Sequence, residues 1–155
     1  MSTTIREAQA HEIEALIPVL LQAEASESAL RWSLDNLSDT VYRMDEDGKL
    51  VGAATLRWNK EPVEIIELAI AEDRHQQGLG RRLIEYLIAE ARRRGKPELF
   101  VGTANSSIGN ILFYQKCGFR MDHIRKDYFW YHQPPDYENG LQVRDLLVFR
   151  YGLAE

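Results

Sequence analysis

A strand followed by a glycine-containing loop and a long helix is the feature that most constrains the fold of this chain. The run Ile66-Glu67-Leu68-Ala69-Ile70 leads through a short acidic turn to His75-Gln76-Gln77-Gly78-Leu79-Gly80-Arg81. The two glycines let the backbone approach a ligand closely, and the helix that follows aims free N–H groups and the positive end of its dipole at an anion. The sequence therefore predicts a phosphate-binding loop at a helix start.

Two common phosphate-binding loops do not fit this segment. No Lys-Ser or Lys-Thr follows the glycines and no four-residue gap separates them, which argues against a nucleoside triphosphatase loop. The dinucleotide fingerprint requires a third glycine where Leu83 stands. On this loop alone, an ordinary strand-to-helix turn stays open as an alternative.

A second segment favours the phosphate-binding interpretation. The stretch from Asn105 to Phe119 follows an apolar strand over 99–103 and contains Tyr114 and the pair Gly118-Phe119. Together the two segments resemble the GNAT superfamily of N-acetyltransferases. The loop is similar to the acetyl-CoA loop of that family, and the later segment is similar to its asparagine, helix, tyrosine and Gly-Phe signature, in the same order and spacing. His75 stands where the family usually has Gln or Arg. The resemblance runs from roughly the first strand to the last.

Length and composition predict one compact domain over residues 1–155. A chain of 155 residues with 45% apolar residues can bury a full core. The net charge of −5, with no basic tract, argues against nucleic acid or an anionic membrane surface as the main partner. We interpret Arg92-Arg93-Arg94 as a solvated helix end that compensates the dipole. A cationic amine substrate suits such a chain.

Cysteine and apolar content indicate the compartment. The single cysteine, Cys117, cannot form an internal disulfide, and four scattered histidines show no metal-ligand spacing. No run approaches a membrane span, and the start Met1-Ser2-Thr3-Thr4 lacks the apolar stretch of a signal peptide. We expect a cytoplasmic protein with no metal and no membrane association.

Hydrophobic periodicity predicts an α+β fold with four helices and seven strands. A helical crossover joins the fourth and fifth strands, which makes them a parallel pair in an otherwise antiparallel sheet. In the family these two strands splay apart and hold the pantetheine arm of the cofactor. The expected helices are 11–23, 25–37, 78–94 and 107–117, and the expected strands are 3–6, 40–44, 49–58, 63–70, 99–103, 128–132 and 143–151.

Amine acetylation requires a base, and Glu67 is the candidate. We expect Glu67 to share one strand face with Ile65 and Ala69, in an apolar run where a carboxylate is costly without a partner or a task. Burial raises the pKa of such a carboxyl toward the range of a general base. The family often places a glutamate here. A solvated Glu67, or one paired with an arginine, is the structural alternative.

Tyr114 is the candidate acid, because the resemblance puts it where the tyrosine of the family protonates the coenzyme A thiolate. A phenol carries its proton at neutral pH. Cys117 suggests an acyl-enzyme alternative, but the C-terminal end of a helix disfavours a thiolate, and a buried structural thiol is the better interpretation.

The resemblance also implies which residues bind the cofactor. The backbone of the fourth strand binds the pantetheine arm, the loop binds the pyrophosphate, and Asn105 contacts the cofactor, with Asn110 as the reserve candidate because Asn105 lies about two residues further from the tyrosine than in many members. The implied cofactor-binding residues are Leu68, Ala69, Ile70, Gln76, Gln77, Gly78, Leu79, Gly80, Arg81 and Asn105.

These residues predict an acetyl-CoA-dependent N-acetyltransferase that acts by direct transfer in a ternary complex. The acceptor is expected to be the primary amine of a small or amino-acid-like molecule, contacted by the first two helices and by the loop over 133–140, with His132 beside it. A homodimer is common in the family, and the same loop is a candidate contact. Two alternatives remain: an acetyltransferase for protein N-termini or ribosomal proteins, and a non-catalytic coenzyme A binding or sensing module.

Overall fold

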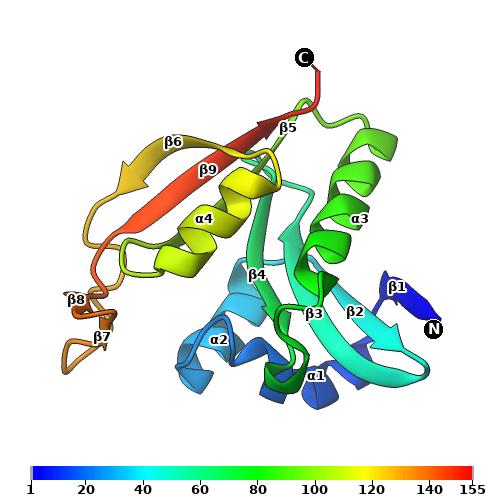
Figure 1. Ribbon diagram of the computed structural model, residues 1–155, viewed down its shortest axis with the longest axis horizontal. Coiled ribbons are helices and arrows are strands. Elements are labelled where there is room, and N and C mark those ends of the chain that lie inside the picture. The colour runs from blue at the N-terminus through cyan, green and yellow to red at the C-terminus, as the bar shows by residue number, and fades with distance from the viewer. Residues whose placement is uncertain (1, 155) are drawn as a thin grey trace.

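The computed structural model describes residues 2–154 and has a seven-stranded sheet at its centre, in the order β1-β2-β3-β4-β5-β9-β6 (Figure 1). A separate two-stranded hairpin is formed by β7 and β8. The predicted α+β class, the four helices and the mostly antiparallel sheet are confirmed. The elements are β1 (Thr3–Glu7), η1 (Ala10–Glu12), α1 (Ile13–Leu20), α2 (Glu27–Asn36), β2 (Thr40–Glu46), β3 (Lys49–Arg57), β4 (Glu64–Ile70), η2 (Glu72–Arg74), α3 (Leu79–Arg93), β5 (Glu98–Ala104), α4 (Ile108–Lys116), β6 (Arg120–Arg125), β7 (Tyr137–Glu138), β8 (Leu141–Gln142) and β9 (Leu146–Gly152).

Two apolar layers cover the two faces of the sheet. On one face, Ala53 and Ala69 pack with the apolar side chains of α1 and with Leu30 of α2. On the other face, Ala54 and Leu56 pack with the broad apolar stripe of α3 and with Tyr114 of α4. In Figure 1, α1 and α2 (blue) lie below α3 and α4 (green and yellow-green). The four helices thus cover both faces of the sheet around its middle strands.

β4 and β5 form the predicted parallel pair, and they separate along their length. Only Glu64 with Phe100 and Ile65 with Val101 are paired, although each strand has seven residues. Figure 1 shows the sheet opening between β4 and the β5–β9–β6 part. Beyond Ile65, β4 therefore keeps β3 on one edge and has no strand on the other.

A bulge in β4 corrects the predicted face of Glu67. The register with β3 shifts between Thr55 and Leu56, so that Thr55 faces Glu67 while Leu56 faces Ile65, leaving one extra residue in β4. A single inserted residue exchanges the two faces of a strand. Ile65 consequently packs on the α3 side, whereas Ala69 packs on the α1 side, as Glu67 does through its contact with α2. The expectation that Ile65, Glu67 and Ala69 share one face is wrong.

The sixth predicted strand is also wrong. Residues 128–131 form turns, and the strand that pairs with the outer edge of β9 is β6, which begins eight residues earlier. A strand was predicted over 128–132 because four of these residues are aromatic, and aromatic residues are enriched in strands. β6, with sequence Arg-Met-Asp-His-Ile-Arg, is an exposed edge strand without apolar alternation. The last strand begins at Leu146, because residues 143–145 serve the preceding loop.

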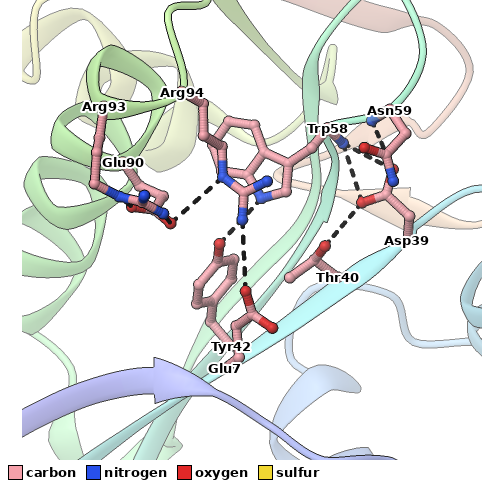
Figure 2. Close-up of polar contacts among 9 residues, drawn as sticks. All are labelled: Glu7, Asp39, Thr40, Tyr42, Trp58, Asn59, Glu90, Arg93 and Arg94. Carbon is pink, nitrogen blue, oxygen red and sulfur yellow. Dashed lines mark hydrogen bonds and ion pairs between the residues drawn. The ribbon is translucent and has the colours of Figure 1, made fainter.

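The arginine cluster at the end of α3 joins the helix to the β2–β3 part of the sheet. Figure 2 shows the Arg94 guanidinium over the ring of Trp58, with its carbon 4.7 Å from the ring centroid. The Trp58 indole N–H donates to the Tyr42 hydroxyl at 3.0 Å, and the Trp58 backbone N–H donates to Asp39. Arg93 forms an ion pair with Glu90. Arg94 therefore contributes to packing and is not simply solvated.

Candidate active site

A large cleft opens where β4 and β5 separate. Its volume is about 1630 Å³, which exceeds the 300–1,000 Å³ usual for a pocket that holds one small ligand. One part is lined by β4, the loop before α3 and the start of that helix. The other part is lined by the α1–α2 connection, α2 and residues 126–138. The cleft has room for two substrates side by side.

The predicted phosphate-binding loop lies in the first part of the cleft. Gln76 and Gly78 have φ angles of 63° and 77°, in the left-handed region that Gly78 adopts without strain. A Cβ on Gly80 would lie 3.2 Å from Phe113 Cζ, so that position is kept free of a side chain. The first turn of α3 presents backbone N–H groups that have no acceptor within the helix. This geometry fits an anion such as a pyrophosphate.

His75 helps to hold the loop. Its imidazole N–H donates to the Ile70 carbonyl, with 2.9 Å between Nε2 and the oxygen. Arg81 lines the cleft and donates to the Lys116 carbonyl at 3.3 Å, and it lies 3.5 Å from Glu85. The loop is therefore tied at one end to β4 and at the other to the C-terminal end of α4.

The free edge of β4 lies beside the loop. Leu68, Ala69 and Ile70 line the cleft, and their backbone has a partner strand only on the β3 side. Unpaired N–H and C=O groups of an edge strand can pair with an extended ligand. The structure thus offers a strand-like site for an arm that runs from the loop into the cleft.

Glu67 is buried in the middle of the cleft, with 8% of its surface exposed. One carboxylate oxygen accepts a hydrogen bond from the Ser33 hydroxyl at 2.8 Å, and the other accepts from the Thr55 hydroxyl. Both donors are neutral, and no arginine or lysine pairs with Glu67 within residues 2–154. Burial raises the pKa of Glu67, which the two hydroxyl hydrogen bonds partly offset, and the nearby Glu24 raises it further. The solvated and arginine-paired alternatives do not apply.

Tyr114 reaches the cleft from α4, within an aromatic cluster. The ring centroids of Phe113, Phe119 and Phe149 lie 5.3, 6.0 and 5.9 Å from that of Tyr114. Burial raises the pKa of the Tyr114 phenol, so the hydroxyl keeps its proton at neutral pH. Cys117 does not line the cleft, and burial raises the pKa of its thiol.

Most but not all predicted cofactor residues line the cleft. Gln77 does not, although Gln76 and Gly78 on either side do. Asn105 does not either, because its amide donates to the Gln142 carbonyl and accepts from the backbone N–H groups of Arg144 and Asp145. The reserve candidate, Asn110, does line the cleft and donates to Thr103.

The second part of the cleft contains polar groups that the sequence did not single out. Glu24 accepts from the Tyr131 hydroxyl and from the Ser26 backbone N–H, each at 3.0 Å. His132 lies beside them and lines the cleft. Ser33 and Thr55, which hold Glu67, were also missed. No periodic pattern in the sequence indicates that these residues share a site. They come together only because α2, β3 and the 126–138 segment pack beside the cleft.

Neither a metal-binding cluster nor a membrane-spanning helix is found among the described residues. Among residues 2–154, no group of three or more His, Cys, Asp or Glu side chains is placed to hold a metal ion. In the same part of the chain, each helix is too short or too polar to cross a bilayer.

Comparisons with known proteins agree with the fold. Residues 7–119 match the acetyltransferase (GNAT) family. The N-acetyltransferase YvbK of Bacillus subtilis is 39% identical over 93 residues, which are 59% of this chain and 60% of that protein. The ribosomal protein bS18 alanine N-acetyltransferase of Escherichia coli is 26% identical over 119 residues, 73% of this chain and 80% of that protein.

A solved GNAT acetyltransferase of Elizabethkingia anophelis with acetyl-CoA bound is 31% identical, with a TM-score of 0.85, and the match covers 97% of this chain and 98% of that one. The family match spans more than half of the chain, and the predicted acyltransferase class is confirmed at the level of the family. This chain belongs to the GNAT family of acetyltransferases.

Proposed function

We propose that this protein transfers the acetyl group of acetyl-CoA to the primary amine of a small acceptor, directly and within a ternary complex. The observation that carries the proposal is Glu67, a buried carboxylate held by two neutral hydroxyls inside a cleft that Tyr114 and the Gly78–Arg81 loop also line. A buried carboxylate without a cationic partner, in a cleft, is typical of a general base.

Acetyl-CoA fits the first part of the cleft. The amides at the start of α3 suit the pyrophosphate, and the free edge of β4 suits the pantetheine arm. The acetyl-CoA bound to the 31% identical Elizabethkingia anophelis protein supports the same co-substrate here. Asn110 replaces Asn105 as the side chain that we assign to the cofactor, because Asn110 lines the cleft.

Glu67 and Tyr114 divide the proton transfers between them. Glu67 accepts a proton from the acceptor amine, whose nitrogen forms a bond to the carbonyl carbon of the thioester. The carbon–sulfur bond breaks, and the Tyr114 hydroxyl donates its proton to the departing sulfur. A backbone N–H of β4 near Leu68 to Ile70 polarises the thioester carbonyl. No covalent acyl-enzyme is needed, and Cys117 takes no part.

Calorimetric titration with acetyl-CoA tests the first half of the proposal. Wild-type protein should bind, and Gly80→Trp should lose binding because a side chain at this position meets Phe113 and fills the loop. Ala89→Trp is the matched control, since Ala89 lies on the exposed face of the same helix, outside the cleft. Its binding should equal that of the wild type. Thermal unfolding of both variants verifies that they are folded.

Thiol release with a panel of amines tests the second half. Turnover on small primary amines supports the proposal. Turnover only on peptides that begin with alanine would favour the protein acetyltransferase, for which the distant bS18 alanine N-acetyltransferase relative is the supporting observation. Binding of acetyl-CoA without turnover on any amine or peptide would contradict the proposal and favour a coenzyme A binding module.

A further inference from the structure

Most buried carboxylates of this protein form ion pairs with arginines, but two in the cleft, Glu67 and Glu24, do not. Glu67 is held by hydroxyls, and the hydrogen-bond donors of Glu24 are the Tyr131 hydroxyl and the Ser26 backbone N–H. The side chain of Glu24 is 14% exposed, so solvent compensates little of its charge. The matched carboxylates are Glu12 and Asp45 with Arg43, Glu46 with Arg74, and Glu64 with Arg57 and Arg125.

His132 is the nearest group that could neutralise Glu24. Its Nε2 lies 3.7 Å from the nearer Glu24 oxygen, beyond hydrogen-bonding distance. This nitrogen is buried and has no hydrogen-bond partner within residues 2–154. Its Nδ1 lies 3.9 Å from Asp136, also too far for a hydrogen bond. Lys126 lines the cleft too, but it is exposed and forms no ion pair with the described carboxylates. Glu24 thus lacks a hydrogen-bonded cation.

The two carboxylates without a cationic partner, Glu24 and Glu67, line the same cleft. Burial is the main reason why the pKa values of Glu67, Tyr128 and Tyr131 are raised. The charge of Glu24 raises the pKa of Glu67 further, and both charges raise the pKa values of the two tyrosines further. Two anions in a partly buried cleft repel each other, and burying them without cations is unfavourable. A ligand that brings positive charge to both carboxylates removes this penalty.

Aromatic rings form the walls and the mouth of this part of the cleft. Tyr128 and Tyr131 line it from within, and Trp32 and Trp130 line it with 57% and 75% of their surfaces exposed. Exposed aromatic faces around a polar pocket are typical of ligand contacts, and they attract cations in particular. The walls therefore suit an alkylammonium ion.

We propose that the acceptor is an aliphatic diamine, whose reacting amine lies at Glu67 while its second ammonium group binds Glu24 between the aromatic walls. This inference rests on the proposed function, because it names the acceptor of the same reaction. The reacting amine gives up its proton to Glu67, whereas the second amine stays protonated and holds the acceptor in place. Glu24 is then a specificity residue that binds the acceptor and does not take part in proton transfer.

Three acceptors with the same four-carbon chain test the proposal: 1,4-diaminobutane, 4-amino-1-butanol and n-butylamine. They share the reacting amine and differ only at the far end, which is cationic, neutral and polar, or apolar. With wild-type protein we expect kcat/KM for the diamine to exceed that for either monoamine by at least about tenfold, the effect of one charge-assisted hydrogen bond of about 1.4 kcal/mol. The assay is run at about pH 8.5 for all three acceptors, where aliphatic ammonium groups remain largely protonated.

Glu24→Gln keeps the shape of the side chain and removes its charge. We expect this variant to lose the preference for the diamine, through a rise in KM for the diamine that is larger than any change in KM for n-butylamine. Glu27→Gln is the matched control, because Glu27 is three residues away, exposed and outside the cleft. It should keep the preference.

The outcomes separate this inference from the proposed function. Equal kcat/KM for the three acceptors in wild type, or an equal loss for all three in Glu24→Gln, overturns the inference and leaves the acetyltransferase intact. Turnover on no amine overturns the proposed function as well. If Glu24→Gln does not fold, the wild-type contrast between the diamine and the amino alcohol decides, with Glu24→Asp, which keeps the charge, expected to retain the preference.

Discussion

At the scale of single residues, burial gives Glu67 an effect on the stability of the fold in addition to its proposed role as a base.

 Burial raises the pKa of this carboxyl, chiefly by desolvation. Between its unfolded and folded pKa values the folded state binds more protons than the unfolded state, so the free energy of unfolding falls as pH rises through that window. The ionised form that we propose as the base is thus the form that destabilises the fold.

Glu67→Gln should therefore lower activity and raise stability. We expect kcat to fall by about 100-fold or more, the usual contribution of a general base. The melting temperature should exceed that of wild type by a margin that grows as pH is raised from about 4 to 8, because only the wild type has the Glu67 carboxyl to ionise in this range. Thermal unfolding across this pH range checks the sign.

Glu64→Gln is the control for this prediction, because Glu64 is buried on the same strand but pairs with Arg57 and Arg125. Removing its charge leaves two arginines without their partner, so this variant should be less stable than wild type. If Glu67→Gln also loses stability at pH 8, then the ionised Glu67 carboxylate does not lower the free energy of unfolding, and the prediction is wrong.

Tyr114→Phe tests the proposed acid. The phenyl ring keeps the contacts with Phe113, Phe119 and Phe149, so folding and acetyl-CoA affinity should change little. The lost hydroxyl should lower kcat by about 100-fold. Calorimetry for affinity and thiol release for turnover separate the two effects. Unchanged turnover would mean that water, and not Tyr114, protonates the sulfur.

At the scale of secondary-structure elements, the end of α3 is fixed to the sheet by Arg94 and Trp58 (Figure 2). Trp58 is almost fully buried, and the guanidinium covers its ring while also lying 3.5 Å from Glu7 of β1. One side chain thus links the helix to two strands on the far side of the sheet from β6.

Arg94→Ala should lower the free energy of unfolding by about 1 kcal/mol or more, the range of a partly buried cation–π contact. Arg93→Ala is the matched control, because Arg93 is exposed and pairs only with Glu90 among the described residues. A surface ion pair of this kind contributes about 0.5 kcal/mol or less. Urea unfolding of both variants measures the difference, and equal losses would contradict the role assigned to Arg94.

At the scale of the whole molecule, the opening between β4 and β5 makes the two parts of the sheet depend on few direct contacts at that seam. A ligand in the opening would contact β4 and the start of α3 on one side and could contact the cleft-lining residues of β5 on the other, and so join these parts. Binding to the folded state alone stabilises it by about 2.7 kcal/mol when the ligand is at 100 times its Kd.

Acetyl-CoA at that concentration should raise the melting temperature by several degrees, since about 1 kcal/mol corresponds to roughly 2–4 °C for a chain of this size. Gly80→Trp should show no shift, and Ala89→Trp should show the wild-type shift. A scanning thermal assay measures all three. An equal shift in Gly80→Trp would place the ligand outside the α3 loop.

Much of this architecture could be predicted from the sequence because local patterns encode it. The apolar stripe of α3, the glycines at 78 and 80 and the alternation in β3 each indicate an element from neighbouring residues alone. The order of these elements, with a helix between β4 and β5, also fixes the parallel pair. The paired motifs then indicated the family, which the comparison confirms.

Tertiary structure decided what local patterns do not encode. The extra residue in β4 turned Glu67 toward α2, because the register with β3 depends on the partner strand and not on the alternation of β4 alone. The edge strand β6 was missed because its side chains are largely exposed and show no apolar alternation. Its backbone pairs with β9, and this pairing leaves no local pattern in the sequence. Glu24 and Ser33 lie near each other in the chain but far from Glu67 and Tyr131, so only the packed fold brings the four residues together in the cleft.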